Sequence, residues 1–530
     1  MKRIFLSLAA AALCSAAQLR AEEKQPANQN AGDSVRMYRL QEVEVTATRA
    51  TPTTPVAYSD IRREEIARNS YGTDIPTLLA LTPSMIATNE TGIGIGGTAV
   101  RLRGTDPTRL NVTINGVAMN NPDSHSMYWY DTPDLVRERI MRPPLGGLNA
   151  SAAYSVRKLD LAFGGSYSYY SCPHWGVLDW VDGLEGSQIG GRWYDNDVDK
   201  HDANLFARAN WSVAKGLRLF ADLQYRYVSY QAWGVNDNYV SEEVGMQPID
   251  VDKQYHFFNP RAGVSYTLAE RNNFYLSFAV AQKEPTRSDF TDRYMFAEAN
   301  TYPSSEKLYD WELGYQYTAP RLSLGVNLYY MKYKDQLVPT GMVNDGSDAL
   351  NTNVPDSYRR GVELSASWRA TGWFTVGANA TFSQNRIENY VDALKDSPTY
   401  GKELGDMTIA YSPDVIANAF LNFHYRGFEA VFHTQHVGKQ YFTNNENDAL
   451  SLDAYCVTNL NLAYTFRTRS ARSVRLGLLI NNLFNAEYES NGYGYSYMDT
   501  WSGPAPVRID EAYYFPQAPL NVLANVTVKF

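Results

Sequence analysis

The chain ends with "NVLANVTVKF", residues 521–530, in which apolar and polar side chains alternate along an extended strand. One side carries Val522, Ala524, Val526, Val528 and Phe530, and the other carries Asn521, Asn525, Thr527 and Lys529, with Leu523 as the exception. Soluble proteins usually shorten, charge or cover such an edge, because its unpaired backbone groups attract another strand. A two-faced strand also suits a place where one face meets lipid and the other meets water. The ending is therefore compatible with a soluble sheet or with a membrane β-barrel.

The N-terminus predicts export from the cytoplasm. A positively charged start precedes the apolar run "IFLSLAAAALCSAA" (4–17), which is too short to span a bilayer and has the pattern of a secretory signal. We expect residues 1–21 to be a signal peptide that is cleaved after Ala17 or Ala21. Ordinary cleavage is favoured over lipid attachment at Cys14, because the preceding side chain is bulky.

The composition favours a barrel for the exported part. No later stretch is apolar enough for a membrane helix, and only helices and closed barrels satisfy their backbone groups in lipid. The chain has 39 Tyr, 21 Phe and 10 Trp, and Tyr and Trp collect at bilayer interfaces. Its net charge of −9 argues against nucleic acid as a partner. The two cysteines beyond the signal, Cys172 and Cys456, are too few for a disulfide framework.

From about residue 157 to residue 530 the chain repeats one unit of two alternating strands, a short turn and a long polar loop. Short turns are expected near 214–216, 269–271, 319–320, 370–372, 426–427 and 468–473. Long loops are expected near 171–200, 229–255, 285–306, 335–356, 387–411, 440–454 and 485–518. A soluble β-sandwich would explain the alternation but not the consistent split of loop lengths, which is typical of outer-membrane barrels. We therefore predict a mainly β fold, an antiparallel transmembrane barrel of about fourteen strands whose last strand pairs with its first.

A polar, flexible segment and a small α/β piece precede the predicted barrel. Residues 22–50 contain "LQEVEVTATR" (40–49), which is either an ordinary first strand or an exposed strand that adds to a partner's sheet. Residues 51–135 carry short helical patterns and two strands. The glycine cluster "GIGIGG" (92–97) is followed by a strand, whereas a dinucleotide-binding loop is followed by a helix, so we do not interpret it as a phosphate site.

These segments resemble the TonB-dependent outer-membrane receptors of Bacteroides-like bacteria. "EVEVTA" (42–47) is similar to the family's TonB box, and the plug-like motifs are "IPTLLALTPSM", "VRLRGTD", "LNVTINGVAMNNPDSHSMYW" and "DTPDL". The barrel-like motifs are "KEPTRSDFTD", "SEKLYDWELGYQY", "NVPDSYRRGVEL", "INNLFNAEYESNGY" and the terminal Phe530. The resemblance implies that a small-molecule chelate binds between outer loops and plug. TonB would then pair with the box by strand addition and, driven by the proton gradient, would pull the plug open.

The resemblance also assigns residues to roles. The strand for the periplasmic domain of TonB would be Glu42, Val43, Glu44, Val45, Thr46 and Ala47. The ligand-facing plug loops would contribute Gly94, Gly96, Asn120, Asp123, His125, Tyr128 and Trp129. The barrel-assembly machinery would read Val526, Val528 and Phe530, and outer-membrane lipids would surround the barrel. No catalytic, metal or cofactor residues are implied, and no enzyme motif stands out.

The pattern breaks after residue 135. Residues 136–156 form an atypical junction where family members continue with the second half of the plug and the first barrel strands. Family barrels belong to the roughly 22-stranded plugged class, so about eight strands are missing. The junction is either a divergent linker in a smaller receptor or an internal deletion, and we favour the deletion because the flanking motifs are well kept. We expect energised transport to be impaired in such a chain.

The sequence orders the possible ligands only loosely. Chelated iron carried by a siderophore is the first expectation, haem the second and cobalamin the third. His433 and His436 lie three apart on a predicted strand, so they point to opposite faces and cannot hold one ion together. His125 and His174 are interpreted as surface histidines of outer loops. A second function class stays open, in which the chain is a passive remnant barrel, a pore or a surface antigen without TonB-coupled transport.

Overall fold

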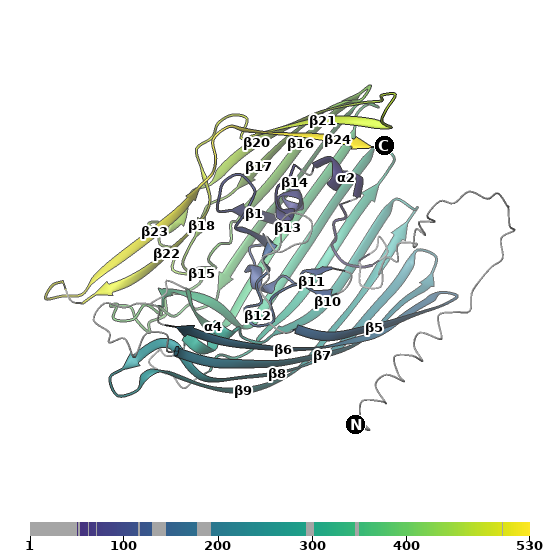
Figure 1. Cartoon of the computed structure of the whole chain (residues 1–530). Coiled ribbons are helices and arrows are strands. Elements are labelled where there is room, and N and C mark those ends of the chain that lie inside the picture. The colour runs from purple at the N-terminus through teal and green to yellow at the C-terminus, as the bar shows by residue number, and fades with distance from the viewer. Residues whose placement is uncertain are drawn as a thin grey trace, which may run out of the picture. The chain divides into compact units, whose positions relative to one another are not determined.

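A large antiparallel sheet dominates the computed structural model (Figure 1). The structure describes residues 50, 54–61, 63–69, 71–114, 117–129, 145–177, 192–292, 302–344, 349–500 and 502–529. The predicted signal peptide, the residues 42–47 of the predicted TonB box, the Asn115–Gly116 turn and Phe530 therefore lie outside the described residues. Among the described residues, no helix has the length and apolar character needed to cross a membrane.

The large sheet has 16 strands in the described part of the chain, and each strand lies beside its neighbours in chain order. They are β5 (Leu145–Val156), β6 (Leu159–Val177), β7 (Arg192–Ala214), β8 (Leu217–Ser241), β9 (Gly245–Leu268), β10 (Asn272–Lys283), β11 (Glu306–Thr318), β12 (Leu322–Val343), β13 (Ala349–Arg369), β14 (Phe374–Ile387), β15 (Met407–Thr408), β16 (Val415–Tyr425), β17 (Phe428–Val437), β20 (Tyr455–Phe466), β21 (Ser473–Asn481) and β24 (Asn521–Lys529). The short β15 pairs only with β14, beside the main path. The prediction of a mainly β, antiparallel fold is confirmed.

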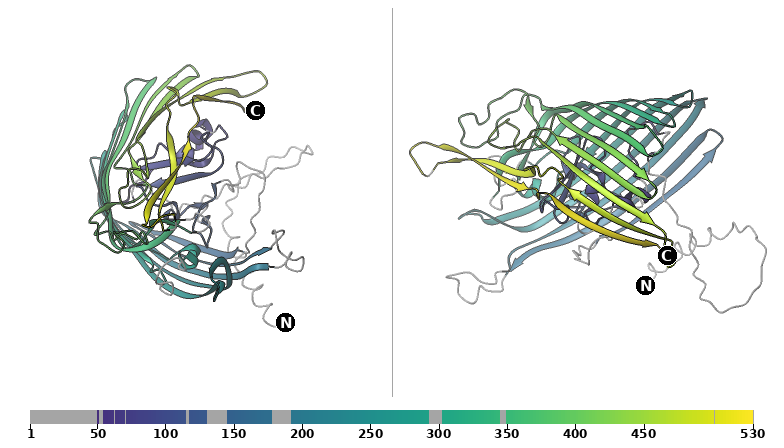
Figure 2. Two further views of the ribbon diagram at one scale, coloured as in Figure 1. Left: turned by 90° about the vertical axis from the view of Figure 1, so that its left-hand side faces the viewer. Right: turned by 90° about the horizontal axis from the view of Figure 1, so that it is seen from above.

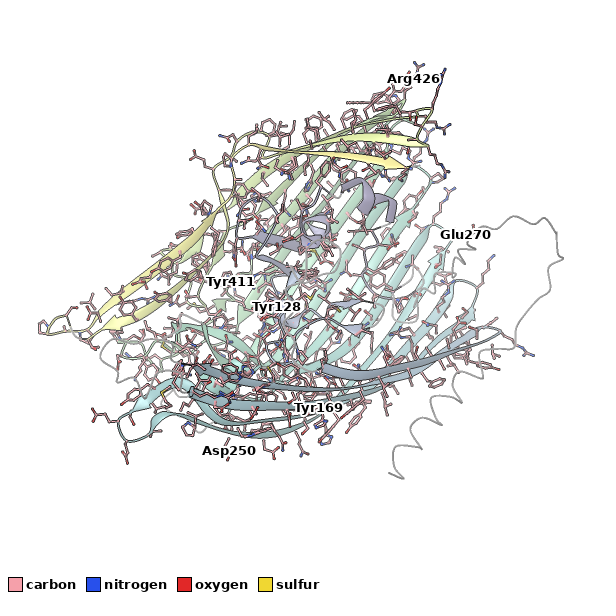
Figure 3. All side chains as sticks on the ribbon, viewed as in Figure 1. Tyr128, Tyr169, Asp250, Glu270, Tyr411 and Arg426 are labelled. Carbon is pink, nitrogen blue, oxygen red and sulfur yellow. The ribbon has the colours of Figure 1, made fainter. Side chains whose placement is uncertain are left out.

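The connections separate into two ends of the sheet, as predicted. Tight turns join β7 to β8, β9 to β10 and β16 to β17. We call the end of the strands where these turns lie the short-turn end. Glu270 and Arg426 lie in two of these turns with positive φ, and Figure 3 places both at the same end, away from Asp250. We call the opposite end of the strands the long-loop end. It carries α4 (Arg287–Thr291), the hairpin of β18 (Gln440–Tyr441) and β19 (Ser451–Leu452), and the hairpin of β22 (Glu489–Asp499) and β23 (Val507–Pro516).

The two faces of β8 and of β24 differ in the way that the alternation predicts. On β8, Leu219 and Leu223 are 39% and 49% exposed on the outer face, while Phe220 and Val228 are buried on the inner face. The same holds at the end of the chain, where Val522 and Val526 of β24 are exposed. An apolar outer face suits hydrocarbon, and Figure 2 shows that the sheet curves so that this face is convex.

Several strands run further than the sequence predicts. A loop was expected near 229–255, but β8 and β9 continue as a paired hairpin through most of this range. The physical reason is that apolar residues occur on both faces of this hairpin, so the period-two signal disappears. Tyr230, Ala232, Ile249 and Val251 are buried on the inner face, whereas Trp233 and Val235 are exposed on the other face. Backbone pairing between the strands continues without this signal.

The strand count and the closure of the barrel differ from the prediction. The prediction began the barrel at residue 157, whereas residues 145–156 of the expected junction form β5, one strand more. The expectation that the last strand pairs with the first is wrong for the described residues, where β24 pairs with β21 and β5 pairs with β6. The reason lies in direction: with this extra strand the two edge strands run the same way, so they cannot form an antiparallel seam.

The N-terminal segment, which we define as the described residues between 54 and 129, lies on the concave side of the sheet (Figure 2). It contains α2 (Arg63–Asn69), α3 (Ile75–Leu79), β1 (Met85–Asn89), β2 (Thr98–Leu102), the 3-10 helix η1 (Pro107–Arg109), β3 (Thr113–Ile114) and β4 (Val117–Ala118). Ile86 of β1 packs in a buried cluster with Ile416 and Val437 of the sheet. Backbone carbonyls after α3 accept hydrogen bonds from Asn379 and Gln435. The segment and the sheet thus share one core.

Candidate functional site

Buried ion pairs join the N-terminal segment to the sheet. Arg103, directly after β2, has a positive φ of 52° and a side chain that is only 9% exposed. Its Nε and Nη2 donate to the two carboxylate oxygens of Glu363 on β13, at 2.8 and 3.0 Å. Its Nη1 lies 2.8 Å from Glu312 on β11. The fork of one guanidinium therefore joins two strands of the sheet to the segment, in the bidentate geometry that arginine favours.

Neighbouring groups fix both partners of this ion pair. Ser84, which is fully buried, donates to the Glu363 carboxylate and shares a 2.8 Å hydrogen bond with Thr381. The Arg103 guanidinium also lies over the ring of Tyr329, 4.1 Å from its centroid. A buried carboxylate is stable as an anion only when such donors replace water. This arrangement holds β1 and β2 against the middle of the sheet.

The turn after Arg103 approaches the sheet so closely that it needs glycine. Gly104 has a φ of +69°, and a Cβ built there would lie 2.8 Å from Ser412 Oγ and 3.0 Å from the guanidinium of Arg359. The buried Arg359 donates to the Arg103 carbonyl and to Ser412, and Ser412 donates to the Gly104 carbonyl. A side chain at position 104 would separate these groups.

A second ion pair holds the 3-10 helix η1. Arg109 donates from Nε to Glu306 at 3.0 Å and from Nη2 to the backbone carbonyl of Leu337. The same glutamate accepts from the Leu337 backbone N–H at 2.6 Å, so β11, β12 and the segment meet at one carboxylate. Asp106 caps η1, and although burial opposes its charge, Arg101 and Arg109 hold the pKa of its carboxyl well below the ordinary range.

The outer loop of the segment, which the family resemblance assigned to the ligand, is bound to the sheet at its long-loop end. Asp123 is buried, accepts a 3.0 Å hydrogen bond from Tyr230 on β8 and lies 3.6 Å from His174 on β6. Asn120 makes hydrogen bonds within the loop. Its side-chain NH2 group donates to the backbone carbonyls of Leu110 and His125, and its side-chain oxygen accepts from the backbone N–H of Val112. These two side chains are occupied by structural contacts.

His125 belongs to a buried network of charges. Lys200 on β7 donates to the His125 Nε2 at 3.1 Å and to Glu284 at 2.9 Å. Arg226 on β8 donates to the same glutamate, and it also contacts Asp202. Burial and the nearby Lys200 lower the pKa of His125 to about 4, so its ring is neutral at pH 7 and Nε2 accepts a hydrogen bond from the Lys200 ammonium group. The 3.4 Å contact between His125 and Glu284 is then a polar contact and not an ion pair.

The other residues assigned to the ligand have different surroundings. Tyr128 and Trp129 are half-buried, and Figure 3 places Tyr128 near the middle of the structure on the N-terminal segment. Gly94 and Gly96 have positive φ, and their N–H groups donate to the side chains of Asn89 and Asp74 respectively. Among the described residues, no cluster of His, Cys, Asp and Glu could hold a metal ion.

The ion pairs of this interface were not singled out from the sequence, although a signal was present. Glu312 and Glu363 lie at inward positions of β11 and β13. A charge in such a place requires a partner, and arginines in the preceding domain were the available ones. Their matching, however, depends on contacts between residues about 200 positions or more apart, which no local pattern records.

Comparison with known proteins supports the same architecture. A family model described as "TonB dependent receptor-like, beta-barrel" matches residues 49–483. Among solved structures, the chain is similar to the ferric-catecholate import receptor Fiu from Escherichia coli K12 in its closed form, with a TM-score of 0.51 and 16% identity over 73% of this chain and 54% of that one.

The copper transporter OprC has a TM-score of 0.53 and 17% identity over 73% of this chain and 56% of that one. The siderophore receptor PiuA from Acinetobacter baumannii has a TM-score of 0.53 and 12% identity over 72% of this chain and 55% of that one. The chain thus spans about half the length of the solved structures that it matches, and at these identities the likeness concerns the fold.

Proposed function

Because the chain belongs to the TonB dependent receptor-like β-barrel family of the outer membrane, we propose that it is a receptor for the energised uptake of a chelated metal. The observation that carries this proposal is the interface between the N-terminal segment and the sheet. Its anchors include Arg103 with Glu363 and Arg109 with Glu306, which are ion pairs that water can replace once the segment moves. An interface held in part by such contacts suits a segment that must shift to open a path.

The proposed ligand is iron bound to a siderophore, with haem as the second choice and cobalamin as the third. Fiu and PiuA are described as receptors for ferric catecholates and siderophores, and OprC as a copper transporter. Of the seven residues that the resemblance assigned to the ligand, Asn120, Asp123 and His125 are engaged with the protein itself. We propose that Tyr128 and Trp129, which are half-buried aromatic side chains of the same loop, contribute ligand contacts.

The proposed energy source is TonB, which would pair with residues 42–47 by adding a strand. Proline at position 45 would remove a backbone N–H and interrupt that pairing. We expect V45P to abolish accumulation of a radioactive ferric siderophore in cells that have no other receptor for it. The matched variant V45A keeps the backbone donor and should retain uptake. Equal uptake by V45P and the parent, or equal uptake with and without TonB, would contradict energised transport.

A second candidate function is a passive or inactive barrel. The observation that favours it is the open sheet, since β5 and β24 are not paired with each other in the described residues. Electrophoresis of purified outer membranes with and without boiling separates the candidates, because a closed barrel stays folded until it is heated. A band that does not shift on heating, together with no uptake, would favour the passive candidate.

A further inference from the structure

The large sheet has two edge strands whose free sides are unpaired in the described part of the chain, which is unusual for a membrane protein. One edge strand is β5, and all twelve of its residues are exposed. The other edge strand is β24, and Val522, Val526 and Val528 on its outer face are exposed. In the described part of the chain neither strand has a partner on its free side, so each presents a row of backbone N–H and C=O groups. In hydrocarbon such groups must be paired.

The directions of the two edge strands follow from the pairing. Every neighbouring pair between β24 and β5 is antiparallel, and the number of reversals along this path is even. β5 and β24 therefore run the same way, from the long-loop end to the short-turn end. A seam between them would be parallel, in a sheet that is otherwise antiparallel throughout.

The edges lack the features that normally prevent pairing. Proteins protect an exposed edge with charges, proline, bulges or short strands. The sequence of β5, "LGGLNASAAYSV", has no charge and no proline, and β24 has only Lys529 at its end. Neither pairs with its present neighbour through a bulge. Both strands are also two-faced, since Leu148 and Tyr154 of β5 lie on the outer face and Asn149 and Ser151 lie on the inner face.

We propose that β5 and β24 together form a docking site for a second polypeptide that contributes an odd number of transmembrane strands. The first and the last of these strands run from the short-turn end to the long-loop end. Only this direction makes the pairing antiparallel at both edges, and antiparallel pairing is the more stable kind. Of the 16 strands of the sheet, 15 lie on the path from β24 to β5, because β15 pairs beside it. A barrel of the roughly 22-stranded plugged class would therefore need about seven added strands, which is an odd number.

A second copy of this chain does not fit the site equally well. Copies inserted in one membrane share one orientation, so β5 of one copy meets β24 of another in parallel. The same is true when β5 and β24 of a single chain meet directly. The partner is therefore distinguished by strand direction and by period-two alternation, with apolar residues that continue the outer face of Leu148 and Tyr154. This partner is separate from the chelate ligand and from TonB.

Strand parity provides the experiment. Strands β6 to β12 of this chain number seven, and the first and last of them run toward the long-loop end. A fragment of residues 157–344, exported with the same signal, is therefore a seven-strand probe that can pair antiparallel with both edges. A fragment of residues 192–344 begins with β7 and is the six-strand control, which can satisfy only one edge at a time.

The readout is disulfide formation in outer membranes. In a chain whose Cys172 and Cys456 are replaced by serine, A152C marks β5 and A524C marks β24, both at exposed positions. Single cysteines are scanned along the first and last strands of each probe. We expect the seven-strand probe to be linked at both marked positions, and the six-strand probe to lose linkage to β24.

Three results would overturn the proposal. An internal disulfide between positions 152 and 524 would show that the chain closes on itself. A disulfide-linked dimer of the chain would identify a second copy as the occupant. Equal disulfide linkage by both probes, or no linkage to a seven-strand probe that is present in the membrane, would show that strand direction does not determine pairing at these edges. The uptake experiment with V45P is independent of all three, so the two proposals can fail separately.

Discussion

Removal of the Arg103 guanidinium should release the N-terminal segment from the sheet. In R103M, the 9%-exposed side chain no longer neutralises Glu312 and Glu363, and both carboxylates are left near the apolar interior. Breaking a buried ion pair by removing one partner costs roughly 3–5 kcal/mol. Since about 1.4 kcal/mol is a factor of ten, local opening should become roughly 10²- to 4 × 10³-fold more frequent. R103K keeps the charge but loses the two-pronged contact, and it should lie between the parent and R103M.

Hydrogen exchange of the purified protein in detergent measures this opening. Amides of β1 and β2 should exchange faster in R103M by about the factor given above, while amides of the sheet far from the segment stay unchanged. The control is K439A, which removes the surface ion pair with Asp448, whose side chains are 40% and 80% exposed. An exposed pair contributes at most about 1 kcal/mol. An acceleration below about tenfold in R103M, or an equal effect of K439A, would refute the reasoning.

Three further outcomes follow from the same interface. Hydrogen exchange of residues 117–129 should accelerate as the pH falls from about 6.5 toward about 4, because the folded pKa of His125 is lowered and its contribution is present above the ordinary pKa and lost below it. Although burial opposes its charge, Lys200 and Arg226 hold the pKa of Glu284 well below its ordinary value, so protonation of this carboxylate should add to the effect only at the acid end of the titration. G104A should lower the melting temperature, whereas G372A, with open space around its Cβ, should not. N120D keeps the acceptor for Val112 but loses two donors, so it should accelerate exchange of the same loop at a cost of about 1–3 kcal/mol.

The parts of the fold that could be predicted from the sequence are those that local physics controls. Alternation over about ten residues marks strands such as β14, and the tight turns at 215–216 and 426–427 carry glycine, which provides the positive φ that they need. β5 escaped prediction because "LGGLNASAAYSV" consists mainly of small residues, whose alternation is weak. Its status as a strand depends on pairing with β6, which is a tertiary contact.

The candidate site divides in the same way. The resemblance located the loop at 120–129 near the long-loop end, and the contacts with Lys200 and Tyr230 agree with that location. It did not show which of these side chains contact the sheet. The hydrogen bonds of Asp123 with Tyr230 on β8 and of His125 with Lys200 on β7 are tertiary contacts that no local pattern records.

Strand direction connects this loop with the open sheet. Asp123 and His125 of the N-terminal segment are held at the long-loop end by Tyr230 and Lys200. The next described strand, β5, also begins at that end. A chain that enters its sheet from one end and leaves it at the other has an odd number of antiparallel strands on its path. The position of the loop at the long-loop end therefore agrees with the odd number of strands on the path from β5 to β24. Antiparallel closure then requires strands that begin at the short-turn end, and the described part of this chain has none to spare for that position.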